Sequence, residues 1–320
     1  MEIKGFTYGF DGQRGDYRSP EGIDSMEKLA ATGTEWACLA FIVYQEKYSS
    51  TQIMFDYKKG ITDKDLISAI EKLHSLGMKV CLKPVINSRD SVWRARITFP
   101  DESDKGLDEY WNEWFSYYQA FLCHYAEIAA DTNCEMFCVG CEMGGTEYKE
   151  KHWRETVAMV KDIYKGPLMY NTNHGHEEQV QWFDAVDYVG VSAYYPLAEG
   201  KEATEENMYQ SWLERKSDLK KLSDKWNKKI IFAEVGIRSA AGCAVMPWDY
   251  LHRDLPYSEE EQANFYNSCM RAFFHEPWFA GFFWWHWDTN LYSLKEAKTD
   301  RHFGIYGKKA ETVLREWYKK

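Results

Sequence analysis

The chain has 320 residues, 45% of them hydrophobic, and a formal net charge of −11 at pH 7. Its hydrophobic content is enough for a large core, and its length is common for an α/β barrel that forms one domain. The acidic balance argues against nucleic acid or an anionic membrane as a partner, because both are bound by basic patches.

Aromatic residues make up 17% of the chain. Such a content fits a core with many large rings, and it equally fits a cleft whose aromatic side chains stack on flat ligands such as sugar rings. Composition does not choose between the two. The first residues, MEIKGFTYGFDG, lack the apolar run of a signal peptide. No uncharged run is long enough to span a membrane. We expect a cytoplasmic protein, with secretion as the alternative if a leader sequence has been removed.

Eight cysteines are present, and several lie inside apolar runs, where a free cysteine behaves as a small buried hydrophobic residue. Cys138 and Cys141 form a C-x-x-C pair, but no second pair follows at the spacing of a zinc ribbon. We therefore expect reduced cysteines, no bound metal and no cofactor.

Short apolar runs alternate along the chain with longer amphipathic segments. The expected strands are 3–10, 36–44, 78–86, 135–140, 167–171, 187–195, 228–236 and 281–287. Each precedes an expected helix, over 19–33, 62–77, 107–130, 152–164, 177–183, 205–226, 258–274 and 309–318. Thr62 is the expected N-cap of the second helix, and Gly77 is expected to close it.

The strands read as continuous apolar runs, which is typical of parallel strands covered on both faces. Eight strand–helix units without a linker or a change in composition favour a single (β/α)8 TIM barrel over a doubly wound sheet. We expect residues 1–320 to form one domain.

In such barrels the active site lies at the C-terminal ends of the strands. Polar and aromatic side chains that follow the expected strands are therefore candidates for the site. They are Lys83, Asn87, Trp93 and Arg94 after the third strand, Glu142 after the fourth, Asn171, Asn173 and His174 after the fifth, Tyr194 and Tyr195 after the sixth, Glu234 after the seventh, and Trp285, His286, Trp287 and Asp288 after the eighth.

Glu142 and Glu234 each end an apolar strand, and each is followed two residues later by a glycine. Strand alternation places Glu142 on the side of Cys138, and Glu234 on the side of Phe232. One glutamate at a strand end is commonly a loop carboxylate with a structural role. Two of them on strands that lie across the barrel mouth suggest the facing carboxylate pair of a glycoside hydrolase.

Two other glutamates of the same region fit a catalytic role less well. Glu135 begins its strand, so it belongs to the opposite face of the barrel, and Glu147 lies past two glycines, where a helix N-terminus favours a carboxylate. His174 and His176 form an H-x-H pair, but barrel hydrolases that bind metal through this motif usually carry it on the first strand. We expect a substrate-contacting or loop histidine and no metal.

The chain resembles glycoside hydrolase family 113, within clan A of the retaining glycoside hydrolases. The segments that carry the resemblance run in order along nearly the whole chain: YQEKYSSTQI, TDKDLISAIEKLHSLGMKVCLKPVI, VWRARI, FCVGCEM, DYVGVSAYYPL, IIFAEVGIRS and GFFWWHW. Known members of this family are mainly β-mannanases.

The resemblance implies a role for each matching residue. Glu142 would be the general acid/base, Glu234 the nucleophile, and Tyr194 a hydrogen-bond donor to the nucleophile. The expected substrate contacts are Lys83, Asn87, Trp93, Arg94, Asn173 and His174, with Trp285 and Trp287 as sugar-facing walls.

Two departures from the pattern concern the sugar contacts. Clan A enzymes usually place Asn before the acid/base, where it binds the sugar 2-hydroxyl, and this chain has Cys141. Asn173 or His174 would then have to supply that contact. Family members often carry His-Val-Asp after the Lys-Pro of the third strand, and here Val85, Ile86 and Asn87 follow.

The resemblance thus implies a retaining endo-β-1,4-mannanase acting on mannan, glucomannan or manno-oligosaccharides. The sequence does not determine the oligomeric state, and a monomer is the default. The alternatives are another clan A β-glycosidase, for β-glucan or a differently linked mannan and possibly exo-acting, or a barrel that binds sugar without catalysis. Endo or exo action depends on how the loops near 88–106 and 238–257 close the cleft.

Overall fold

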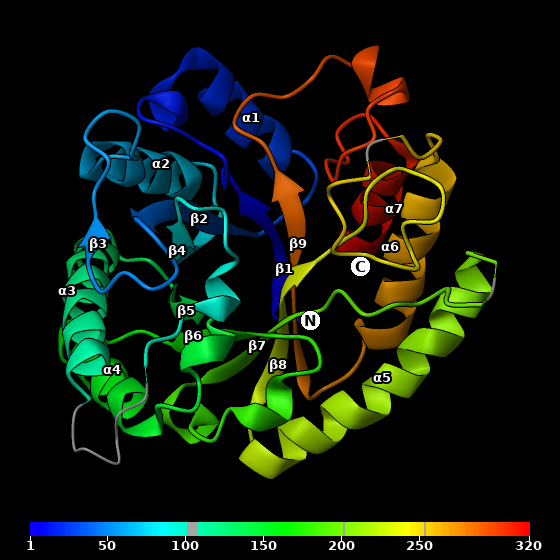
Figure 1. Cartoon of the computed structure of the whole chain (residues 1–320). Helices are drawn as coiled ribbons and strands as arrows, with labels where there is room; N and C mark the ends of the chain where they lie inside the picture. Colours follow the sequence, from blue (N-terminus) through cyan, green and yellow to red (C-terminus); the bar gives the residue numbers. More distant parts are fainter. Residues whose placement is uncertain (101–107, 201, 253) are drawn as a thin grey trace.

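The computed structural model describes residues 1–100, 108–200, 202–252 and 254–320. Eight parallel strands close into a barrel, because β1 pairs with both β9 and β2 (Figure 1). The strands are β1 (Ile3–Tyr8), β2 (Trp36–Gln45), β4 (Lys79–Ser88), β5 (Met136–Cys141), β6 (Leu168–Asn173), β7 (Tyr188–Ser192), β8 (Lys229–Val235) and β9 (Phe279–Trp287). The two-residue strand β3 (Ile53–Met54) pairs antiparallel with the end of β2. The predicted (β/α)8 barrel is confirmed.

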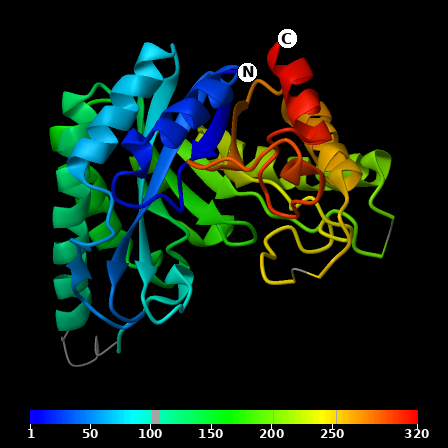
Figure 2. The ribbon, with the colours of Figure 1, turned by 90° about the horizontal axis from the view of Figure 1, so that it is seen from above.

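Helices surround the strands, as the view from above shows (Figure 2). They are α1 (Pro20–Ala30), α2 (Asp63–Ser75), α3 (Glu109–Asp131), α4 (Glu150–Ile163), α5 (Glu205–Trp226), α6 (Glu259–Phe273) and α7 (Lys309–Tyr318). Thr62 caps α2 as predicted, in a reciprocal capping box with Asp65. The predicted start of α3 at residue 107 lies outside the described residues. None of the helices in the described ranges is long and apolar enough to cross a bilayer.

The helix predicted over 177–183 is wrong. Two short 3-10 turns, Glu177–Gln179 and Phe183–Ala185, take its place between β6 and β7. Val180 adopts an extended backbone between the two turns, with φ −77° and ψ 114°, and this interrupts the helix. Val180, Trp182 and Phe183 are all buried in this arrangement.

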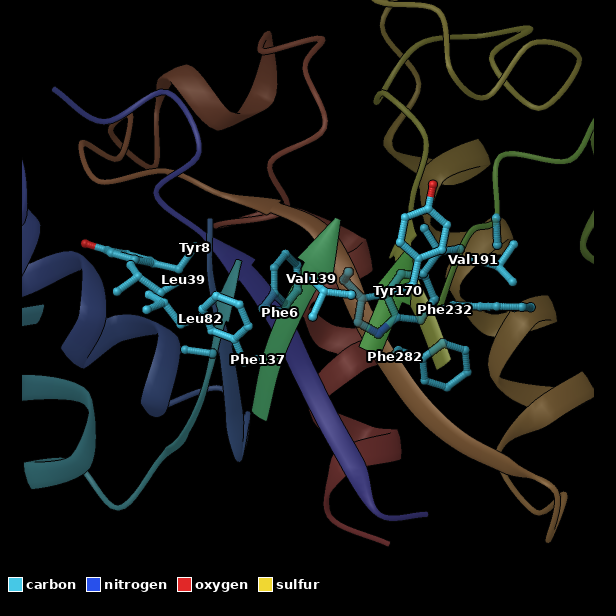
Figure 3. Packing of buried hydrophobic residues seen from close by; sticks show 14 of the residues in the cluster. Phe6, Tyr8, Leu39, Leu82, Phe137, Val139, Tyr170, Val191, Phe232 and Phe282 are labelled. Carbon is cyan, nitrogen blue, oxygen red and sulfur yellow. The ribbon is translucent and has the colours of Figure 1, made fainter. Parts of the chain in front are cut away.

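The hydrophobic core has two layers. The larger layer lies between the strands and the helices and includes Phe137, Val139, Phe232 and Phe282 (Figure 3). The smaller layer consists of strand residues that alternate with those of the first, and it fills the inside of the barrel. Its members are Ile3, Trp36, Cys38, Cys81, Met136, Cys138, Met169, Ile231, Ala233, Ala280 and Phe283. The polar residues described next lie beyond this inner layer, toward the C-terminal ends of the strands.

Candidate active site

An irregularity in β5 sets the direction of the first candidate carboxylate. The register between β5 and β6 shifts between Cys138 and Gly140, so Cys138 and Cys141, three residues apart, both face the barrel interior. The predicted alternation from Cys138 to Glu142 is therefore wrong. Glu142 instead follows the strand in the left-handed region, with φ 55°, and its backbone N–H donates to the carbonyl oxygen of Asn171 at 2.7 Å.

A similar irregularity acts on β8. Phe232 packs outward against Trp212 and Phe273, so Glu234 does not share its side as strand alternation predicts. The register with β9 shifts between Phe232 and Val235. Glu234 consequently turns into the barrel, where it meets Lys83 from β4.

Three side chains donate hydrogen bonds to the Glu234 carboxylate. The Lys83 ammonium lies 2.6 Å from Oε1, and the Cys141 thiol lies 3.3 Å from the same oxygen. The Tyr194 hydroxyl donates to Oε2 at 3.1 Å. Donors on a carboxylate favour its ionised form.

Charge around Glu234 outweighs the effect of its burial. Burial alone would raise the pKa of this carboxyl, but Lys83, Arg94 and the hydrogen bonds from Lys83 and Cys141 together lower it below its ordinary value. Burial likewise tends to lower the pKa of Lys83, yet the acidic groups beside it, Cys141 and Glu234, raise it well above its usual range. Glu234 is therefore held as a buried anion beside a buried cation.

Glu142 has a different environment. Its Oε2 accepts a hydrogen bond from the Trp93 indole N–H at 3.2 Å and lies 3.2 Å from Nη2 of Arg94. Arg94 is fixed in turn by hydrogen bonds to the carbonyl oxygen of Cys141 at 3.1 Å and to Oδ1 of Asn87 at 2.8 Å. Both contacts to Glu142 end on Oε2, and within the described part of the chain no donor lies on Oε1.

The residue between the two carboxylates is Cys141. Glu142 follows Cys141 directly in the chain, and the Cys141 thiol contacts the Glu234 carboxylate. The sequence-predicted residues Lys83, Asn87, Trp93, Arg94 and Tyr194 all gather around this centre. Sequence reasoning treated Cys141 only as a missing Asn and did not identify it as a contact of the site, whereas its neighbour Asn171 was one of the candidates at the strand ends.

Asn173 and His174 lie at the end of β6. Asn173 is buried, and its Oδ1 has no hydrogen-bond partner within the described residues. The His174 ring stacks on Trp248, with centroids 5.4 Å apart and planes inclined by 28°. Trp248 is 44% exposed and is not among the residues predicted from the sequence. It lies in the loop near 238–257 that was expected to shape the cleft, so an aromatic residue there could have been proposed as a site residue.

The two predicted aromatic walls behave differently. Trp285 is half-buried and packs edge-on against Phe10, 4.7 Å between ring centroids, and its peptide bond to His286 is cis. Trp287 is only 1% exposed, and its indole N–H donates to Ser25. The expectation that Trp287 faces a sugar is therefore wrong, because its ring is part of the core.

The described residues include one group of three metal-ligating side chains with ligand atoms within 4.8 Å of one another, namely Asp11, His286 and Asp288. His174 and His176 do not belong to it. Neither candidate carboxylate belongs to it either.

Comparison with known proteins agrees with this geometry. The family model of Glycoside Hydrolase Family 113 matches residues 6–308. No curated protein matches significantly. Among solved structures, the GH113 β-mannanase AaManA from Alicyclobacillus acidocaldarius, in complex with ManMIm, is 39% identical over 99% of this chain and 97% of its own, with a TM-score of 0.90.

A second solved structure, titled as a complex of a GH113 β-1,4-mannanase, is 34% identical over all of both chains, with a TM-score of 0.91. A β-glucuronidase of Ruminococcus gnavus is only 13% identical, with a TM-score of 0.66 over half of its own length, and shares the fold alone. The match to the family model and the identity to its solved members agree along nearly the whole sequence. The chain belongs to glycoside hydrolase family 113.

Proposed function

We propose that the protein is a retaining endo-β-1,4-mannanase in which Glu234 is the nucleophile and Glu142 the general acid/base. The observation that carries the proposal is the contrast between the two carboxylates. Glu234 is buried, anionic and fixed by three donors, whereas Glu142 is bound through one oxygen and has the other free of protein donors in the described residues. Retaining glycosidases need one carboxylate of each kind.

In the first step, an oxygen of Glu234 attacks the anomeric carbon while Glu142 gives its proton to the departing glycosidic oxygen. The bond to the leaving sugar breaks, and a covalent glycosyl-enzyme forms. In the second step Glu142, now ionised, takes a proton from a water molecule that attacks the same carbon. The sugar is released with its configuration retained, and both carboxyl groups return to their starting state.

The surrounding residues support these roles. Tyr194 and Lys83 hold the nucleophile in place, and the resemblance predicted this role for Tyr194. Because the Lys83 ammonium is bound to Glu234, it is less free to contact sugar hydroxyls. Arg94 and the Trp93 N–H hold Glu142 through Oε2 and leave Oε1 for the proton transfers of the two steps. The exposed face of Trp93, which is 46% exposed, and the half-buried Trp285 are the proposed sugar-stacking surfaces.

The substrate is inferred from the relatives, two of which are named β-mannanases in complexes. We propose a β-1,4-linked mannan or manno-oligosaccharide, and Asn173 with its unpartnered buried oxygen as a contact for a sugar hydroxyl. Endo action, the monomeric state, the cytoplasmic location and the single domain over 1–320 stay predictions. Of the two segments expected to govern endo action, residues 101–106 of the first and residue 253 of the second lie outside the described ranges.

The test is product analysis after incubation with mannohexaose and, in parallel, cellohexaose. We expect mixed short manno-oligosaccharides and no cleavage of cellohexaose. Release of mannose alone would show exo action, and cleavage of cellohexaose alone would overturn the substrate. Binding of mannohexaose without any turnover would identify a sugar-binding barrel instead of an enzyme.

A further inference from the structure

A chain of hydrogen bonds runs from β7 across β6 and β5 to the carboxylate of Glu234. Ser192 Oγ donates to Oδ1 of Asn171, and Nδ2 of Asn171 donates to the Cys141 sulfur, both at 3.3 Å. The thiol then donates to Oε1 of Glu234, also at 3.3 Å. We propose that Asn171 is a positioning residue that acts through Cys141 and keeps the thiol proton directed at the nucleophile.

The direction of the thiol proton follows from the partners around the sulfur. Nδ2 of Asn171 lies 3.3 Å from it and Nη2 of Arg94 lies 3.8 Å from it. An amide NH2 and a guanidinium can only donate, so neither accepts the thiol proton. Among the contacts of the sulfur in the described structure, the carboxylate of Glu234 is the acceptor. The proton therefore points at the nucleophile.

The orientation of the Asn171 amide is what secures this arrangement. Were the amide reversed, its oxygen would face the sulfur and accept the thiol proton, and Glu234 would lose a donor. The Ser192 hydroxyl donates to Oδ1 on the opposite side. With the amide reversed, the Ser192 oxygen could accept from the NH2 group, but its proton would lose the one acceptor it has within the described residues, which favours the observed orientation. Asn171 is fully buried, and it is paired with Cys141 in the register of β5 and β6, so its backbone has little freedom to move.

The thiol stays protonated in this environment. Burial raises the pKa of Cys141 far above its ordinary value, even though Lys83 acts in the opposite direction. The charged and titratable groups around Glu234 within the described residues are Lys83 from β4, Arg94 after β4, Cys138, Cys141 and Glu142 in and after β5, and Tyr194 after β7. The thiol thus adds a neutral donor to a carboxylate that two cations already stabilise.

The inference rests on the proposed role of Glu234, but its test does not depend on turnover. The carboxyl carbon of Glu234 is titrated by 13C NMR and assigned by its absence in Glu234→Gln. Cys141→Ala removes the thiol donor, and Asn171→Leu removes the hydrogen bond that holds the sulfur in place and so weakens the same donor. Weakening or loss of a donor raises the pKa of a carboxyl, so both substitutions are expected to raise the pKa of Glu234, by up to about one unit. The acid limb of kcat/KM on mannan should move with it.

The double variant decides whether Asn171 acts through the thiol. If it does, Asn171→Leu in the Cys141→Ala background adds no further shift. The conservative Cys141→Ser, which keeps a donor, should leave the pKa of Glu234 close to that of the wild type. Ser192→Ala is the milder substitution and should give a smaller upward shift that also disappears in the Cys141→Ala background.

Two results would overturn the proposal. One is an unchanged pKa of Glu234 in Asn171→Leu with a loss of stability or activity, which indicates a purely structural asparagine. The other is a double variant in which the increases in the pKa of Glu234 caused by Asn171→Leu and by Cys141→Ala add up. If Asn171→Leu does not fold, Ser192→Ala is measured in the wild type and in the Cys141→Ala variant, and the same comparison tests whether the effect acts through the thiol. Failure of the proposed function would appear differently, as a wild-type protein that titrates as expected but does not cleave mannan.

Discussion

The ammonium group of Lys83 lies 2.6 Å from the carboxylate of Glu234, and the two side chains are 0% and 4% exposed. They come from β4 and β8, which are far apart in the sequence and in the strand order of the barrel. Removing one partner of a buried ion pair leaves an uncompensated charge, which costs more than the pair itself contributes. This pair therefore links the stability of the barrel to the chemistry of its nucleophile.

Lys83→Met is expected to lower the free energy of unfolding at neutral pH by about 3 kcal/mol, because the Glu234 carboxylate loses its buried counter-charge. Urea unfolding followed by circular dichroism measures the change. Lys221→Met is the matched control, since its pair with Asp218 is 72% and 69% exposed. It should change stability by no more than about 0.5 kcal/mol. An equal, small effect of both substitutions would contradict the view that Lys83 balances a buried anion.

The lowered pKa of Glu234 sets the sign of a pH effect on stability. Burial opposes the shift, but Lys83 and Arg94 outweigh it and keep the folded-state pKa below the unfolded value. The ionised carboxylate therefore contributes stability that is fully present above the unfolded pKa, about 4.3, and is lost as pH falls through the folded-state pKa. The stability of the wild type relative to Glu234→Gln should decrease over this acidic range. A difference that grows on acidification would be incompatible with a lowered pKa.

Glu142→Gln is expected to lower kcat/KM on mannan by about 10²–10⁴, the usual range for loss of a general acid/base. Added azide should restore turnover with activated aryl β-mannosides and give a β-glycosyl azide, because azide needs no general base. Glu147→Gln is the control from the same segment. Its carboxylate accepts hydrogen bonds from Tyr170 and Thr172 behind the site, so activity should stay near that of the wild type. A severe loss in Glu147→Gln with an active Glu142→Gln would reverse the assignment.

Two tryptophans should respond in opposite ways to replacement by phenylalanine. Trp93→Phe keeps a ring but loses the donor to Glu142, so kcat should fall by about tenfold with little change in stability. Trp287→Phe loses buried hydrogen bonds to Ser25, so stability should fall by about 1–3 kcal/mol while KM is unchanged. Steady-state kinetics and thermal unfolding of both variants provide the comparison. A raised KM in Trp287→Phe would indicate that the Trp287 ring contacts the sugar after all.

The eight strand–helix units were predictable because parallel strands and their covering helices have distinct apolar patterns. The ends of β5 and β8 were also predictable, which is why Glu142 and Glu234 were identified. The directions in which the Glu142 and Glu234 side chains point were not predictable. Shifts in register at Cys138–Gly140 and after Phe232 break the period of two, and no residue type in the sequence marks them.

The partners of these carboxylates were predictable only in part. Tyr194 was expected beside Glu234 from the resemblance, and the contact is present. The environment of Cys141 was not expected, because its contact with Asn171 depends on the registration of two strands that sequence does not specify. Trp287 was expected as a sugar-facing wall from the resemblance, which does not show the register shift between β1 and β9 or the burial of its ring.

The most direct measurement is to trap the glycosyl-enzyme with a 2-deoxy-2-fluoro mannosyl fluoride and locate the label by peptide mass spectrometry. The fluorine slows both steps, and the good leaving group speeds the first, so the covalent intermediate accumulates. We expect one sugar per protein, attached to Glu234 and absent in Glu234→Gln. A label on Glu142, or turnover of mannan with inverted configuration and no label at all, would contradict the assignment of Glu234 as the nucleophile.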